Sequence, residues 1–228
     1  MRFKLPLVVV AMVLFSCPGV AVAAPKSYCD ELEGVKTEEA CKILMTRPGY
    51  SIDINLPSFY PDQKLLTEYV KELRDKFLDQ ADSSETRAAP YELDVTSTTF
   101  ESAVPPRGTE SLVLKTYENV GGAVPKTSYK AFNWDQAYRK AITYDNVWKP
   151  DTDPLPTIFP IIQSELAKQM EQQVSIAPNV GLDPANYQNF AIKNDGLVFF
   201  FNPGELLPEA AGPIQVTVPR SAIDPMLA

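Results

Sequence analysis

The spacing of apolar residues changes twice between residues 50 and 96, and this change most constrains the fold of the chain. Residues 52–56 alternate between apolar and polar side chains, the period of a strand with one buried face. After Pro61 the apolar residues recur every three or four positions, which predicts an amphipathic helix of about 20 residues. Alternation returns at residues 91–96. The apolar stripe of the helix consists of Leu65, Leu66, Tyr69, Val70, Leu73, Phe77 and Leu78.

The opposite face of this helix carries charges of both signs. Such a mixture is typical of a solvated surface, and a charged partner-binding face is the alternative. The charged positions are Lys64, Glu68, Lys71, Glu72, Asp75 and Lys76.

Two further strands are predicted at residues 111–117 and 127–134. The pair Gly121-Gly122 separates them and indicates a turn. Because no helix of crossover length lies between these strands, we expect antiparallel neighbours.

The second half of the chain has its own helix and strands. Thr157 is the expected N-cap of the helix, and residues 197–201 are apolar throughout, which predicts a strand covered on both faces. The fold class is therefore predicted as α+β: an antiparallel sheet with one packed helix in each half, and a β-grasp-like second half. The halves are expected at residues 24–122 and 123–228. A last alternating strand contains Ile214, Val216 and Val218.

The first 23 residues have the order of a secretory signal peptide. Arg2 and Lys4 precede an apolar run at residues 5–15, and cleavage is predicted between Ala23 and Ala24. An apolar run of eleven residues is shorter than the roughly 20 that span a bilayer, so no integral membrane span is expected.

An alternative interpretation makes residues 14–17 a lipoprotein box with Cys17 acylated, although Phe15 fits that box poorly. The signal-peptide interpretation predicts a secreted, extracellular protein. Losing Arg2 and Lys4 with the leader changes the net charge from −8 to −10. Such a surface repels phosphate backbones, which excludes nucleic acid as a partner.

Two cysteines, Cys29 and Cys41, remain after the leader. In an oxidising compartment this pair predicts one disulfide, which would stabilise the fold by roughly 3 kcal/mol. A redox-active pair is the weaker alternative, because the spacing is not Cys-x-x-Cys.

The chain contains no histidine. Ser-His-Asp and Cys-His catalysis and the usual catalytic zinc sites are therefore excluded, and no P-loop or dinucleotide motif occurs. We predict no enzyme activity, no cofactor and no metal. A glycan hydrolase that uses two carboxylates remains as an alternative, because it needs only two acids about 5–10 Å apart. The candidate acids are Asp135, Asp145, Asp151 and Asp153.

Two loops are candidates for partner binding. The first is the Gly121-Gly122 turn. The second follows the apolar strand at residues 197–201 and carries two leucines that look exposed. A structural connector is the favoured role of this loop, and a recognition loop is the alternative. Its candidate residues are Asn202, Glu205, Leu206 and Glu209. Six aromatic residues lie between positions 129 and 148. We interpret them as core or sheet-face residues, with an interface patch as the alternative. They are Tyr129, Phe132, Trp134, Tyr138, Tyr144 and Trp148.

Four segments carry a resemblance to a known family. Residues 24–29 (APKSYC), 56–64 (LPSFYPDQK), 89–93 (APYEL) and 201–212 (FNPGELLPEAAG) are similar to the secreted mycobacterial immunogenic proteins of the MPT/MPB sixty-four group. This resemblance spans essentially the whole chain. It implies a secreted antigen without assigned enzyme activity, acting at the host interface.

A weaker resemblance links the second half to the lysozyme-sensing ectodomain of RsiV-like anti-sigma factors. It lies in residues 121–125, 132–135 and 207–212, where Val124 and Glu209 stand in place of the usual His and Tyr. We therefore expect a non-enzymatic, monomeric antigen that binds an unknown host protein, with a lysozyme-like cationic protein as one candidate. A module that binds lysozyme or peptidoglycan fragments is the main alternative.

Overall fold

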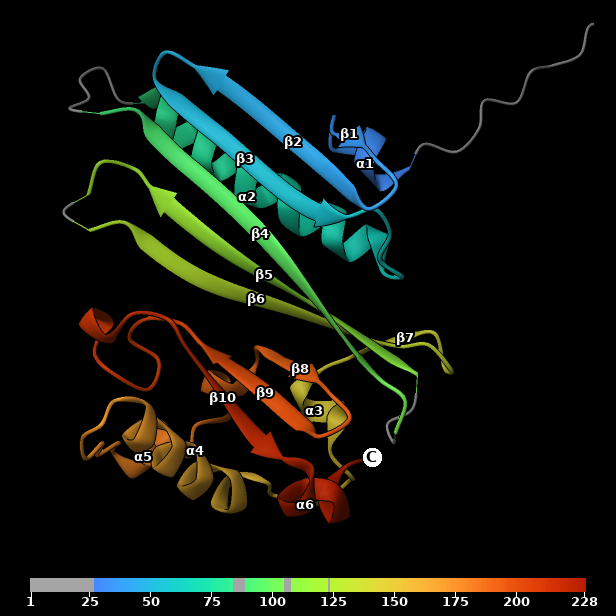
Figure 1. Ribbon diagram of the computed structural model, residues 1–228, viewed down its shortest axis with the longest axis vertical. Helices are drawn as coiled ribbons and strands as arrows, with labels where there is room; N and C mark the ends of the chain where they lie inside the picture. Colours follow the sequence, from blue (N-terminus) through green and yellow to red (C-terminus); the bar gives the residue numbers. More distant parts are fainter. Residues whose placement is uncertain (1–26, 84–88, 105–107, 123) are drawn as a thin grey trace, which may run out of the picture.

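The computed structural model describes residues 27–83, 89–104, 108–122 and 124–228 (Figure 1). The predicted leader, with Ala23 and Ala24, lies outside the described residues. None of the described helices is both long enough and apolar enough to cross a membrane.

The first sheet has seven strands, and their order in space equals their order in the chain. Five of the six pairings between neighbouring strands are antiparallel, as the sequence predicts, but β3 and β4 run parallel. The reason is the long helix α2, Gln63–Ser83, which carries the chain back between these two strands. The strands are β1 Val35–Lys36, β2 Ala40–Arg47, β3 Tyr50–Pro57, β4 Tyr91–Ser102, β5 Thr109–Asn119, β6 Lys126–Asp135 and β7 Lys140–Ile142.

Helix α2 covers one face of this sheet, as the spacing of its apolar residues predicts (Figure 1). Leu66, Val70 and Phe77 are buried against alternate residues of β3, β4 and β5. Burial of each such side chain contributes about 1.5–3 kcal/mol. The first core therefore lies between α2 and the sheet.

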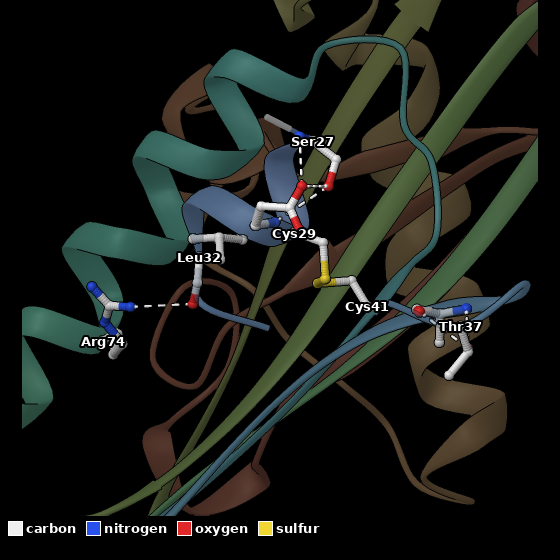
Figure 2. The surroundings of a disulfide bond; sticks show 8 residues. Ser27, Cys29, Leu32, Thr37, Cys41 and Arg74 are labelled. Atoms are coloured by element: carbon white, nitrogen blue, oxygen red, sulfur yellow. Dashed lines mark hydrogen bonds between the residues drawn. A yellow bond between two sulfur atoms is a disulfide. The ribbon is translucent and has the colours of Figure 1, made fainter. Parts of the chain in front are cut away.

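A disulfide closes the N-terminal edge of this core (Figure 2). Cys29 of α1, Tyr28–Glu31, is bonded to Cys41 of β2, with a Cα–Cα distance of 5.6 Å. Arg74 of α2 donates a hydrogen bond to the Leu32 carbonyl at 3.4 Å, so α1 is also joined to α2 (Figure 2).

The second sheet has three antiparallel strands in the order β10-β9-β8. Its central strand β9, Gly196–Phe201, is buried at every position, which confirms the prediction of two covered faces. Phe199 and Phe201 belong to the core with α4, Leu155–Gln169, whereas Val198 and Phe200 pack against β5 and β6. The layers are therefore α2, large sheet, small sheet and α4. The outer strands are β8 Phe190–Ile192 and β10 Ile214–Pro219.

Short elements complete the second half. The helices are α3 Tyr144–Val147, α5 Pro178–Gly181 and α6 Arg220–Ile223, and the 3₁₀ helices are η1 Pro184–Tyr187, η2 Glu209–Ala211 and η3 Asp224–Met226.

Two details of the sequence prediction change. Helix α4 has Pro154 as its N-cap, so Thr157 lies inside the first turn. Pro156 sits in that turn as well, where its missing N–H costs no intrahelical hydrogen bond. The predicted division between residues 122 and 123 falls in the β5–β6 turn, so the seven-stranded sheet takes strands from both predicted halves.

Candidate binding site

Asn202 and Glu205 tie the predicted recognition loop into the fold. Asn202 Oδ1 accepts a hydrogen bond from the Tyr129 backbone N–H at 2.6 Å. The Glu205 carboxylate accepts from the Asn202 backbone N–H at 2.6 Å and from Asn202 Nδ2 at 3.0 Å. Both side chains are satisfied within the protein, which favours the connector role. We call these two residues the clasp.

Leu206 is a correction to the sequence prediction. It looked exposed, yet it is 6% exposed and belongs to the core under α4. Leu207 packs on the same core and is partly buried. The loop folds back because burying a leucine is worth more than leaving it in water. Among the four candidate residues of this loop, only Glu209, at the start of η2, is exposed.

Asn202 of the clasp binds a backbone N–H group at the edge of β6. This strand is at the sheet edge along residues 126–132, because β7 pairs only with residues 133–135. The N–H groups of Tyr129 and Ala131 are bound by side-chain oxygens of Asn202 and Asn189, at 2.6 and 3.1 Å. An open edge is a template for pairing with another strand. Two asparagines therefore bind two of the N–H groups along this edge.

The Gly121-Gly122 turn also has a backbone explanation. Gly121 has φ +75°, and a Cβ there would lie 3.0 Å from Cε1 of Tyr91. Glycine fits this position because it adopts positive φ without steric cost. The partner-binding role of Gly121 and Gly122 stays a prediction.

A cavity of about 370 Å³ opens between α2, β6 and the segment that joins β7 to α3. Glu68 and Glu72 are four residues apart on α2, so both carboxylates lie on one face of the helix. Asp62 adds a third acid just before the helix begins. We call this cavity the acidic groove. Its aromatic wall consists of Tyr60, Tyr69, Phe132 and Tyr144.

The groove has an excess of negative charge. Three carboxylates and one cation, Lys130, line the cavity, and Lys64 outside the lining pairs with Glu68 at 3.8 Å. The Nζ of Lys130 lies 6.0 Å from the ring centroid of Tyr69 and 5.8 Å from that of Phe132. This is the geometry of a cation–π contact. The groove thus already holds an ammonium group against its aromatic wall.

The tyrosines of the groove are neutral hydrogen-bond donors near pH 7. Burial raises the pKa of Tyr60, and the carboxylates of Asp62 and Glu110 raise it further. Burial likewise raises the pKa of Tyr69, with smaller contributions from Glu72 and Glu118. A phenol that keeps its proton does not add to the negative charge of the groove.

Asn133 lines the groove at β6, but its side-chain amide contacts the small sheet. It is 5% exposed, and its Nδ2 donates to the Phe190 carbonyl at 2.9 Å. Its Oδ1 has no hydrogen-bond partner among the described residues, which is unusual for a buried polar atom. Because Oδ1 is buried, it is not exposed to a ligand in the groove.

Three of the four candidate hydrolase acids share a second hollow, of about 500 Å³. Asp145, Asp151 and Asp153 line it beside Trp148. Asp135 is elsewhere, and its Oδ1 accepts from the backbone N–H groups of residues 137 and 138, both at 2.9 Å. Within the described part of the chain, no group of three or more acidic or cysteine side chains is placed to hold a metal ion.

The sequence does not reveal the acidic groove as a unit. The charges on α2 predict a solvated face, with a partner-binding face as the alternative, and Phe132 is predicted as a core, sheet-face or interface aromatic residue. Lys130 falls within a predicted strand and has no predicted role. The one available signal was the Glu68–Glu72 spacing beside Tyr69. The aromatic set divides in a similar way: Phe132, Tyr144 and Trp148 are buried, and Tyr138 is 77% exposed.

Comparison with solved structures supports the fold. The family model for a protein of unknown function, DUF3298, matches residues 145–221. A crystal structure of a DUF3298 protein from Bacteroides fragilis has a TM-score of 0.58 and 16% identity, covering 86% of this chain and 94% of that one. At this identity the likeness shows the fold alone.

Comparison with curated proteins shows the family. The esterase Rv3036c of Mycobacterium tuberculosis is 46% identical, covering 96% of each chain. Immunogenic proteins MPB64 of Mycobacterium bovis and MPT64 of Mycobacterium tuberculosis are 66% identical over 228 residues, all of each chain. The chain therefore belongs to the MPB64/MPT64 family of mycobacterial immunogenic proteins, as its sequence motifs indicate.

Proposed function

We propose that this protein is a secreted antigen that acts by binding a cationic host protein, without catalysis, and that the acidic groove is its binding site. The observation that carries the proposal is the combination of three carboxylates and an aromatic wall in one cavity. The relatives named as immunogenic proteins support the antigen role.

The groove suits a lysine or arginine side chain. Lys130 already places an ammonium about 6 Å from two ring centroids, so the wall accepts a cation. A partner cation in the groove would meet Glu68 and Glu72. The net charge of −8 would speed the encounter with a basic protein.

The test is a calorimetric titration with lysozyme, a cationic protein, at low and at physiological salt. We expect binding that weakens as salt rises, and a loss of about tenfold in the double variant Glu68→Gln/Glu72→Gln. The matched control is Glu38→Gln/Glu171→Gln, which removes the same charge from exposed glutamates outside the groove and outside the candidate loops. Equal loss in both variants would show that net charge alone matters and would reject the groove.

Ester hydrolysis is a second candidate function, because the 46% identical relative is named an esterase. This chain has no histidine, so a serine nucleophile would need another base. Incubating the purified protein with p-nitrophenyl esters tests it. Turnover above that of a heat-denatured sample would favour the esterase and would contradict action without catalysis.

A further inference from the structure

A second groove lies on the other side of β6 from the acidic groove. The small sheet packs over β5 and β6 through Phe200 and Val198, and Phe100 of β4 is partly buried at the same contact. Where β4 and β10 separate, a groove of about 430 Å³ remains between the two sheets.

The charged side chains that line this groove are basic, whereas the whole chain has a net negative charge. Lys115 and Lys193 line it, and none of its lining residues is acidic, although the chain has 29 acids and 21 bases. Lys193 pairs with Asp195 at 3.2 Å, and that carboxylate is 68% exposed. Lys115 has no ion-pair partner among the residues that the structure describes.

The floor of the groove is aromatic. Phe200 is 3% exposed, and its ring centroid lies 5.1 Å from that of Tyr129 and 6.0 Å from that of Phe100. Burial raises the pKa of Tyr129, so its hydroxyl is a neutral hydrogen-bond donor. Thr98 of β4 and Gln215 of β10 stand on opposite sides with exposed polar side chains.

This combination selects one class of ligand. Small inorganic anions would use the lysines and leave the aromatic floor unused, and a neutral sugar would leave the lysines unused. An acidic sugar chain uses both, because pyranose rings have apolar faces, many hydroxyl groups and, in uronic acids, a carboxylate. Pockets with an apolar floor and a few polar groups are typical of small-ligand sites.

We propose that the groove between β4 and β10 binds an acidic oligosaccharide. Lys115 and Lys193 contact the sugar carboxylates, the rings of Phe100 and Tyr129 contact the apolar face of a sugar, and Thr98 and Gln215 bond its hydroxyls. This site is independent of the acidic groove and of the protein partner proposed for it.

The test uses calorimetry with three probes: a hyaluronan hexasaccharide, which alternates glucuronate with N-acetylglucosamine, a neutral chitin hexasaccharide, and inorganic phosphate. We expect the hyaluronan hexasaccharide to bind, and the other two to bind at least tenfold more weakly. Lys115→Gln and Lys193→Gln should each weaken hyaluronan binding by about tenfold, the loss expected for one hydrogen bond to a charged group.

Lys42→Gln is the matched control, because Lys42 is an exposed strand lysine outside the groove. It should leave affinity unchanged. Absence of hyaluronan binding would overturn the proposal. Equal binding of phosphate or of the chitin hexasaccharide would also overturn it, as would equal losses in Lys42→Gln and Lys115→Gln.

Discussion

The core under α2 and the core under α4 are built from different side chains. The first is mainly aliphatic, with Ile52, Ile54 and Leu93 fully buried, and a disulfide closes its edge. The second contains no cysteine and is rich in rings, with Tyr187 in edge contact with Phe199 at 5.5 Å and with Phe201 at 5.6 Å. One half thus gains stability from a covalent crosslink, and the other from aromatic packing.

Polar side chains join the two sheets to each other. Ser111 Oγ accepts from the Ile192 N–H at 2.9 Å, and Asn194 Oδ1 accepts from the Ala103 N–H at 2.8 Å. The clasp at Asn202 is one more such bond. Asn202 thus shows that a polar loop residue that looks available for recognition can instead hold two sheets together.

Phe199→Ala tests the aromatic core and should have the largest effect. Phe199 is fully buried, and losing such a ring costs about 3–5 kcal/mol of unfolding free energy. Urea unfolding measures the loss. Phe59→Ala is the control, since Phe59 is 59% exposed, and should change stability little. Similar losses in both variants would contradict the packing described for β9.

Cys29→Ser tests the crosslink in the first half. Removing the bridge should lower the free energy of unfolding by roughly 3 kcal/mol, because the unfolded chain is no longer constrained. Thermal melts should show a folded protein with a lower midpoint. Reductant should lower the wild-type midpoint in the same direction and leave the variant unchanged. An unaltered melt in oxidising buffer would argue against any role of the bridge in stability.

Asn202→Ala tests the hydrogen bond that joins the two sheets at β6. It leaves the Tyr129 N–H without its partner, at a cost of about 1–3 kcal/mol. Lysozyme binding should not change, because Asn202 does not line the acidic groove. Glu209→Ala, in the same loop, is the control and should leave stability unchanged. If Asn202→Ala instead abolished binding of lysozyme and kept full stability, the loop would be a recognition loop after all.

Glu110→Gln tests a small electrostatic cost in the large sheet. Burial raises the pKa of Glu110, and Glu101, directly opposite on β4, raises it further. A carboxyl whose pKa is raised by folding destabilises the protein once pH exceeds the ordinary value of about 4.3. The variant should therefore gain a few tenths to about 1 kcal/mol at pH 7, and the gain should disappear below pH 4. Melts from pH 3.5 to 7.5 measure this, and a gain that grows toward acid would contradict it.

Regular elements could be predicted from the sequence, because each has a single period. The α2 stripe, the alternation of β3 and the apolar run of β9 identify these elements and their buried faces. The parallel pairing of β3 with β4 follows only when α2 is treated as a crossover. Leu206 shows the limit: a leucine in a polar loop gives no periodic signal, and its burial depends on the distant α4 core.

The candidate site was harder to predict for the same reason. The acidic groove takes residues from α2, β6 and α3, which are up to 80 positions apart in the chain. In the sequence, Glu68 and Glu72 look like any solvated pair, because only the fold brings them into one cavity with Lys130 and Asn133. Long-range placement of this kind has no signature in a local pattern.

An NMR titration of the ¹⁵N-labelled protein with lysozyme tests the binding site most directly. Binding at the acidic groove predicts that amide shifts change along residues 62–72 and at Lys130 and Asn133. Amides of residues 202–212 should stay unchanged. Shifts confined to residues 202–212, or an absence of shifts at low salt, would contradict the groove as the site where this family member meets a cationic partner.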